Sequence, residues 1–484
     1  MNKYMQKYRQ MPAPIKASLC FLMCSFFQKG LSTITTPIFT RILTTEEYGQ
    51  ISVFNSWMSI IAPIVCLNLY SGVYSQGLVK FEEDRKRYSS SLQGLCFTLT
   101  AIWGMIYLSG RNFWNNLLSL TTMQGIAMLV MIWASSTFSF WSMNQRVDFK
   151  YKKLVLLTAA VSIVQPIVGI TLILNSEDKV TARILGIAAV QLVFYFGTFI
   201  TQMLQGKQFF SKRYWAYALK FNIPLLPHYL SIHLLSSSDR IMISKLVGDG
   251  QAGIYNLAHS VALIMTIFNT AMLQTIEPWI YRKLKENRTM DLAKVAYPTF
   301  VAVAIVNILL ILFAPEIIAI FAPVEYQEAV WTIPGLALSV FFMFLYTFFA
   351  TFEFYYEKTS YIASATVGGA LLNIVLNYVF IKKFGYIVAG YTTLFSYVVF
   401  AVLHYYFCHR ICKEYMDGVK PYNTKVILAI SAGTLLIGLS ILLVFPYPLI
   451  RYGFIVLLLA GLVMFRKRII STAKMIWATK KERG

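Results

Sequence analysis

The chain has 484 residues, of which 57% are hydrophobic and only 13% charged, and its mean hydropathy is +0.60. This composition excludes an ordinary soluble domain, which is nearer half apolar and a quarter charged. Apolar stretches of roughly 20 residues, enough to cross a bilayer, recur from end to end. The net charge of +22 therefore indicates basic loops beside a membrane rather than nucleic-acid binding. The sequence predicts an all-α polytopic membrane protein.

About fourteen membrane spans are predicted from the apolar stretches. The first six cover residues 17–42, 49–74, 89–108, 117–142, 153–174 and 182–204. The next six cover 218–245, 252–280, 295–314, 328–352, 360–381 and 386–410, and the last two cover 425–445 and 450–466. The span over 218–245 is the most polar of the set.

The distribution of charge predicts the topology. With the N-terminus inside, 33 of the 43 Lys and Arg residues fall on the inner side and 9 on the outer side. This asymmetry fits an even number of spans, so both termini are expected to be cytoplasmic. The first apolar stretch is too long for a cleavable signal peptide. The loops are short, and no Gly-rich phosphate loop appears, so no ATPase or cofactor is expected. The six cysteines form no CxxC pair, so no metal is expected either.

An internal repeat is visible in two segments of the chain. One reads "TRILTTEEYGQISVFNS" and the other "DRIMISKLVGDGQAGIYNLAHS". Arg41 and Arg240 occupy matching places six spans apart, which predicts a parallel pseudo-repeat of two six-helix lobes. We expect an N-lobe over residues 1–205, a C-lobe over 206–415, and two extra helices with a basic tail in 416–484.

Two longer segments resemble a known family. They are "FFQKGLSTITTPIFTRILTTEEYGQISVFNSW" and "FNIPLLPHYLSIHLLSSSDRIMISKLVGDGQAGIYNLAHS". They are similar to polysaccharide-export flippases, of the Wzx type, in the multidrug/oligosaccharidyl-lipid/polysaccharide exporter superfamily. The most specific part of the match comprises Asp239, Arg240, Gly248, Gly253 and Tyr255.

The resemblance implies a two-lobed transporter of fourteen helices in the bacterial plasma (inner) membrane. It would move an undecaprenyl-pyrophosphate-linked oligosaccharide from the inner to the outer leaflet. Its last two helices would form a groove for the lipid tail among the membrane lipids. Its protein partners would be a polysaccharide polymerase and export machinery for O-antigen, capsule or exopolysaccharide.

A pyrophosphate headgroup requires cations inside the membrane, where each ionisable residue costs about 2.5–3.5 kcal/mol. Lys29 lies near the middle of the first span and is the only ionisable residue deep in the first six spans. We interpret Lys29 as a cavity cation, and the alternative is a lysine that snorkels to an interface.

Arg41 and Arg240 lie at the outer ends of matching spans and could form a second anion site. The alternative for Arg41 is an ion pair with Glu46 or Glu47. For Arg240 the alternative is a bond to Asp239 or to a nearby carbonyl, and neighbours on a helix do not face each other. For Arg41 we favour the ion pair, and for Arg240 both interpretations stay open.

Asp239, Glu277 and Glu353 are candidates for coupling or ion-pair acids. A partly buried carboxylate at Glu277 could carry a coupling proton. An ion pair of Glu277 with Arg282 or Lys283 is the interpretation that we favour.

Glu353 lies near an inner helix end, four residues before Glu357 and close to Lys358, which favours an interfacial charge cluster. Pro224 and Pro227 each remove a backbone hydrogen bond, which predicts a kink or interruption in the span over 218–245 that we interpret as a hinge.

Two other function classes compete with the flippase. A drug or cation exporter of the same superfamily would need carboxylates in its cavity, and the first six spans carry Lys29 instead. A membrane polysaccharide polymerase or ligase would need a large outer loop with acid or base residues. The outer loops of this chain are short and nearly featureless.

Overall fold

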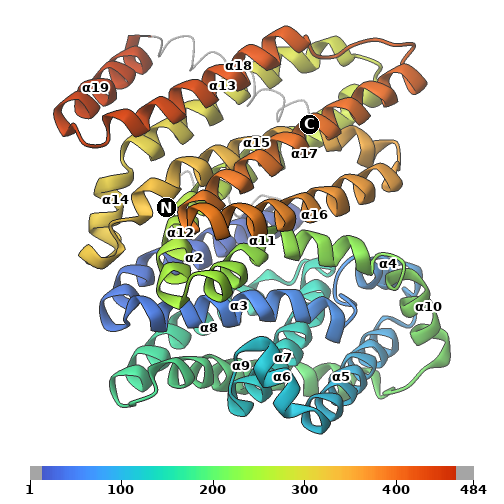
Figure 1. The fold of residues 1–484 in the computed structure, drawn as a ribbon. Helices are drawn as coiled ribbons and strands as arrows, with labels where there is room; N and C mark the ends of the chain where they lie inside the picture. Colours follow the sequence, from blue (N-terminus) through green and yellow to red (C-terminus); the bar gives the residue numbers. More distant parts are fainter. Residues whose placement is uncertain (1–12, 465–484) are drawn as a thin grey trace, which may run out of the picture. The chain divides into compact units, whose positions relative to one another are not determined.

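The structure is a computed structural model that describes residues 13–464, and its regular elements are helices throughout that part of the chain (Figure 1). The chain forms two compact units, Met1–Ile241 and Met242–Gly484. Ten helices in the described part are long and apolar enough to cross a membrane. The predicted class, an all-helical polytopic membrane protein, is confirmed. The predicted lobe limits at 205/206 and 415/416 follow the sequence repeat and stay a prediction.

The first unit is organised around α9 (Lys179–Gly206), which packs against α3, α5, α7 and α8. Helix α2 packs mainly on α8. The other helices are α2 (Ala13–Ile42), α3 (Thr45–Val65), α4 (Gly72–Lys80), α5 (Arg85–Ser109), α6 (Arg111–Leu118), α7 (Thr122–Val147), α8 (Tyr151–Leu174), α10 (Lys212–Asn222) and most of α11 (Leu226–Leu246).

The second unit is organised around α15 (Ala329–Tyr355), which lies beside α17 in Figure 1 and also packs against α12 and α13. Its most apolar window is 83% buried, as expected for a helix that is hydrophobic on every side. The other helices are α12 (Asp249–Lys285), α13 (Leu292–Leu312), α14 (Ala314–Phe321), α16 (Thr359–Phe384), α17 (Ala389–Tyr415), α18 (Thr424–Ser440) and α19 (Pro448–Met464).

Each predicted span has a helix, but not every such helix is membrane-like in composition. The ten apolar, membrane-length helices coincide with predicted spans 3–6 and 8–13. The other four predicted spans fall on α2, α3, α11 and α19, which are more polar or, for α19, only 17 residues long. The total of fourteen spans and the cytoplasmic termini therefore stay predictions.

The second predicted span, 49–74, is wrong at its end. Helix α3 stops at Val65, because Leu67 and Asn68 adopt the left-handed backbone conformation with φ of 47° and 50°. The chain then reverses into the short helix α4. Nothing in the apolar pattern marks this turn.

The predicted interruption of the seventh span is confirmed. Helix α10 ends at Asn222 and α11 begins at Leu226, with Pro224 in the break between them. Pro227 lies in the first turn of α11, where a missing N–H costs little. The Asn222 side chain, which is fully buried, donates from Nδ2 to the carbonyl oxygen of Leu67 at 2.7 Å. A hinge role for Pro224 and Pro227 stays a prediction.

Candidate functional site

Helix α2 carries a polar stripe along one face. Ser25, Lys29, Ser32, Thr33 and Thr36 are three or four residues apart, so they share that face. The hydroxyls of Ser25, Thr33 and Thr36 donate to the carbonyls four residues earlier at 3.1, 2.9 and 3.0 Å. Their protons are thus satisfied within the helix, and their oxygen lone pairs stay available as acceptors.

Lys29 lies in the middle of this stripe. Its side chain is exposed, and its ammonium has no ion-pair partner between residues 13 and 464. The hydroxyls beside it extend the polar surface over several turns of α2. An unpaired ammonium among hydroxyl oxygens is chemically suited to a phosphate group attached to a sugar.

Arg41 and Arg240 make the same local contact. Arg41 donates from Nη1 to the carbonyl of Pro37 at 2.8 Å, and Arg240 donates from Nη2 to the carbonyl of Ser236, each four residues earlier. Arg41 is exposed, whereas Arg240 is 8% exposed and also donates from Nε to Ser56 Oγ at 2.9 Å. Arg240 therefore holds α11 against α3.

The acids proposed beside these cations have different surroundings. Asp239 is 2% exposed. Glu277 in α12 accepts a hydrogen bond from the Tyr281 hydroxyl at 3.1 Å. Lys283, one of the two cations expected for Glu277, lies instead 3.1 Å from Glu286.

Glu353 is fully buried, which differs from the expected interfacial cluster. Its Oε1 lies 2.7 Å from Nδ1 of His404, which is 1% exposed. Lys358 pairs at 2.8 Å with Glu414, whose hydrogen bond raises the Lys358 pKa, and Glu357 is exposed. The error arose because a helix end near charged residues resembles an interface in the sequence.

The buried pair has spare hydrogen-bonding capacity. Glu353 Oε2 and His404 Nε2 have no hydrogen-bond partner within residues 13–464. The imidazole of His404 stacks on Tyr346 with ring centroids 5.2 Å apart and meets the edge of Phe400 at 4.5 Å. A carboxyl and an imidazole so enclosed can share or exchange a single proton.

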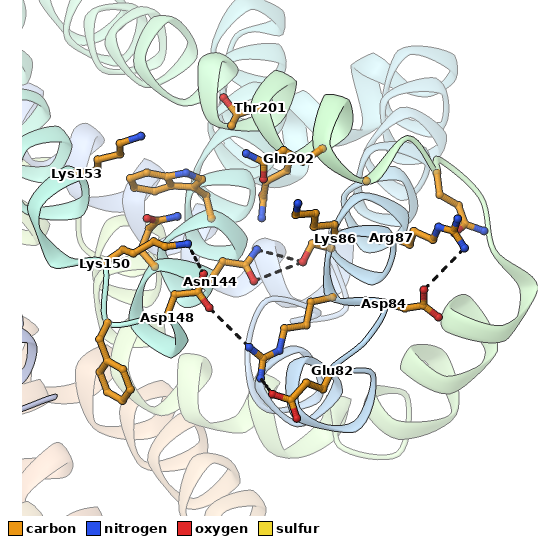
Figure 2. A pocket seen from close by; sticks show the side chains of 18 of the residues that line it. Glu82, Asp84, Lys86, Arg87, Asn144, Asp148, Lys150, Lys153, Thr201 and Gln202 are labelled. Atoms are coloured by element: carbon orange, nitrogen blue, oxygen red, sulfur yellow. Dashed lines mark hydrogen bonds and ion pairs between the residues drawn. The ribbon is translucent and has the colours of Figure 1, made fainter. Parts of the chain in front are cut away.

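A cavity of about 1660 Å³ opens in the first unit, where the start of α5, the end of α7, the turn into α8 and the end of α9 converge (Figure 2). We call it the basic pocket. All of these segments belong to loops that the charge distribution predicts on the inner side. Its charged lining residues are Glu82, Glu83, Asp84, Arg85, Lys86, Arg87, Asp148, Lys150, Lys152, Lys153 and Lys207.

The charges of the basic pocket do not cancel. Asp148 lies 2.7 Å from Lys150 and 3.7 Å from Arg85, as Figure 2 shows around Asp148. Arg85 also binds Glu82 at 3.0 Å, and Arg87 lies 3.8 Å from Asp84. Four lysines of the lining have no acidic partner in the described part of the chain. They are Lys86, Lys152, Lys153 and Lys207.

The floor of the basic pocket is a hydrogen-bonded network. Asn144 donates from Nδ2 to the Tyr74 hydroxyl at 2.8 Å and to Ser89 Oγ at 3.1 Å. The Tyr74 hydroxyl in turn donates to Ser89 Oγ at 2.7 Å. Gln202 lies deeper, where its Oε1 accepts from Gln93 Nε2 at 2.6 Å. Because each amide is held by neighbours, the floor is fixed before any ligand binds.

A run of serines fixes the wall of the pocket to the following loop. Ser90 Oγ donates to the Gln208 carbonyl at 2.8 Å, and the Ser91 carbonyl accepts from Trp215 Nε1 at 2.9 Å. Gly206 approaches α5 so closely that an added Cβ would lie 2.1 Å from the Lys86 carbonyl oxygen. The end of α9 is therefore closely packed on the start of α5.

Sequence reasoning missed both the basic pocket and the Glu353–His404 pair. The lysines of the pocket were explained by membrane topology alone, and that explanation does not depend on whether they converge. The sequence signals that were present are Ser89, Asn144 and Gln202, polar residues on three different predicted spans or their ends.

These observations define a multi-pass membrane protein with polar and cationic surfaces. Residues 15–284, more than half of the chain, match the family described as polysaccharide biosynthesis protein, and the chain belongs to this family. A relative in Haemophilus influenzae, "Lsg locus putative protein 1", is 23% identical over 363 residues, which cover 73% of this chain and 87% of the relative.

Solved structures show the same fold. The lipid II flippase MurJ in an inward closed conformation has a TM-score of 0.68 at 16% identity, covering 93% of this chain and all of that one. An inward-facing multidrug resistance MATE transporter of the MOP superfamily has a TM-score of 0.61 at 14% identity, covering 80% and 96%.

The resemblance to the polysaccharide exporters and the multi-pass location in the bacterial inner membrane are thereby confirmed. The evidence is the family match, the shared fold, the ten membrane-length helices and a second Haemophilus influenzae relative described as a membrane protein.

Proposed function

We propose that the protein is a flippase that moves an undecaprenyl-pyrophosphate-linked oligosaccharide from the inner to the outer leaflet during surface polysaccharide assembly. The observation that carries the proposal is Lys29, whose exposed ammonium in the polar stripe of a 30-residue helix has no ion-pair partner among residues 13–464. Membership of the polysaccharide biosynthesis family and the fold shared with a lipid II flippase support it.

In the proposed cycle, fourteen spans with cytoplasmic termini work by alternating access with a cationic cavity. The Lys29 ammonium binds the pyrophosphate, and the hydroxyl oxygens of Ser32 and Thr36 accept hydrogen bonds from the sugars. Arg41, exposed at the end of the same helix, meets the anion later. The prenyl tail stays in lipid, against α18 and α19.

Arg240 is the weaker candidate for direct substrate contact. Its guanidinium is already engaged by Ser56 and by the carbonyl of Ser236. Within the proposed cycle Arg240 keeps α11, the helix that begins after Pro224, in place beside α3.

The Glu353–His404 pair is our choice for proton coupling over Asp239 and Glu277. The two groups lie 2.7 Å apart and are both shielded from solvent, and each has a further polar atom that finds no partner in the described part of the chain. Glu353→Gln should abolish the stimulation of flipping by a pH gradient while preserving slow equilibration between leaflets. Unchanged stimulation in Glu353→Gln would move the coupling site elsewhere.

A drug or cation exporter is the second candidate, because multidrug transporters share this fold. A liposome assay separates the two. Purified protein should flip a fluorescent pyrophosphate-linked oligosaccharide, measured by accessibility to an external quencher or lectin, and should not move a cationic dye. Dye transport without flipping would favour the exporter, and a new glycosidic product would favour a polymerase.

A further inference from the structure

The basic pocket is not required by the transport path proposed for Lys29, so its purpose needs a separate explanation. It lies where α5 begins and where α7 and α9 end, and none of its lining residues belongs to α2. A solvated rim of lysines would be expected beside any membrane. A concave site with a preformed polar floor is not explained by that rule.

The size of the pocket indicates the size of a ligand. Its volume of about 1660 Å³ exceeds the roughly 300–1,000 Å³ of sites for drug-sized molecules. A single phosphate ion would leave most of this space filled by water. Several sugar rings could be accommodated together with a phosphate.

The charges indicate that the ligand is an anion. Three of the four acids of the lining are engaged by Arg85, Arg87 and Lys150, and Glu83 is the one lining acid without an ion pair to a described residue. Lys86 and Lys153, both labelled in Figure 2, come from different helices and have no acidic partner in the described residues. Lysines act as point charges toward phosphate and need no fixed geometry.

The uncharged polar side chains above the floor indicate that the ligand also carries hydroxyl groups. The lining includes the amides of Gln145 and Gln205 and the hydroxyl oxygen of Thr201. The amides of Asn144 and Gln202 are already held by their neighbours in the floor. Amides donate and accept hydrogen bonds together, as the hydroxyl pattern of a sugar requires. An anion-only site would not need acceptors such as these.

We propose that the basic pocket binds a phosphorylated saccharide, with its lysines on the phosphate and the side chains of Gln145, Gln205 and Thr201 on the sugar. The inference rests on the proposed function, since the substrate of that function bears both groups, and it names a loading site on the cytoplasmic side of the first unit. A lipid-linked and a soluble sugar phosphate share the chemistry that the pocket recognises.

The binding test uses the full chain in phosphatidylcholine nanodiscs and isothermal titration. N-acetylglucosamine 1-phosphate should bind roughly tenfold more tightly than inorganic phosphate or free N-acetylglucosamine, and added salt should weaken its binding. Equal affinity for inorganic phosphate would reduce the pocket to an anion surface and overturn the proposal. If the pocket binds phosphatidylglycerol added to the disc and does not bind the sugar phosphate, the pocket is a site for a lipid headgroup. That result would also overturn the proposal.

Variants locate the site. The triple change Lys86→Gln, Lys152→Gln and Lys153→Gln should weaken sugar-phosphate binding at least about tenfold. A matched triple change removes the same charge outside the pocket and should leave binding unaltered: Lys382→Gln, Lys383→Gln and Lys425→Gln. Equal losses in both triple variants would mean that bulk charge, rather than the pocket, attracts the ligand.

Variants of uncharged lining residues test the contact with the sugar separately from the contact with the phosphate. Thr201→Val with Gln205→Ala should weaken sugar-phosphate binding several-fold and leave inorganic phosphate unaffected, because both side chains line the pocket and neither pairs with a lysine. If neither sugar-phosphate binding nor phosphate binding changed, a contact of Thr201 and Gln205 with the sugar would be contradicted.

A parallel flipping assay keeps the two proposals distinguishable. The lysine variant should need a higher concentration of lipid-linked saccharide for half-maximal flipping, with little change in the maximal rate. A wild-type protein that binds sugar phosphate but flips nothing would refute the flippase and leave the pocket standing. One that flips but binds no sugar phosphate would refute the pocket alone.

Discussion

The turn after α7 and the turn after α15 have the same backbone and different chemistry. Phe149 and Glu357 are both left-handed, with φ of 55° and 56°. One residue later, Lys150 and Lys358 each donate their backbone N–H to the carbonyl five residues earlier at 2.8 Å. The turns occupy corresponding places in the predicted six-span repeat, so the likeness extends the repeat from sequence to local structure.

The carbonyl that closes each turn belongs to a residue with a different role. Gln145 in the first unit lines the open basic pocket. Glu353 in the second unit is fully buried against His404, and Lys358 beside it is paired with Glu414. In the predicted repeat, the backbone of the turn is alike at the two places while the side chains differ. The first turn borders a pocket that has lysines without acidic partners among the described residues, and the second lies beside charges that pair with each other.

The largest effect is expected in the second unit, at the buried Glu353–His404 pair. His404→Ala removes the partner of a fully buried carboxylate and should lower the stability by about 3 kcal/mol. Thermal unfolding in detergent measures it. His409→Ala, on an exposed face of the same helix, is the matched control and should change stability by less than about 0.5 kcal/mol. Equal shifts in the two variants would mean that the pair carries no buried charge.

A smaller effect is expected in the first unit, at Gly206 in the wall of the basic pocket. Gly206→Ala brings a Cβ within 2.1 Å of the Lys86 carbonyl oxygen and should cost about 1–3 kcal/mol through overpacking. Gly197→Ala lies in the same helix with nothing within 4 Å of the new Cβ, so it should be neutral or stabilising by about 0.5–1 kcal/mol. Stabilisation by Gly206→Ala would contradict the close approach of α9 to α5.

The smallest effect tests the shared backbone itself. Phe149→Gly and Glu357→Gly each relieve a left-handed residue of a steric cost of roughly 1–2 kcal/mol, offset by greater freedom in the unfolded chain. Both variants should therefore shift stability by less than about 1 kcal/mol, and in the same direction. Opposite signs would show that the two turns are not equivalent.

The helices and their polar exceptions could be predicted from the sequence, because hydropathy is a local property. Lys29 was identified because a lysine within an apolar stretch is visible without any structure. The break at Pro224 was visible for the same reason, since proline acts on its own helix.

The pairings could not be predicted, because they join residues that are distant in sequence. Glu353 and His404 are 51 residues apart, and no period in either helix links them. The basic pocket needs three loops to converge, and the positive-inside rule gives the same count of lysines whether they converge or spread apart. The turn at Leu67 and Asn68 is a backbone conformation without a glycine or proline to mark it.

The central claim is that Lys29, a cation in the polar stripe of α2 with no ion pair to any described residue, receives the pyrophosphate. Flipping of a pyrophosphate-linked oligosaccharide in liposomes by Lys29→Gln and Lys29→Arg tests it most directly. The account predicts at least a roughly tenfold slower rate for Lys29→Gln and near-normal rates for Lys29→Arg, because only the charge is essential. Wild-type rates in Lys29→Gln would contradict it.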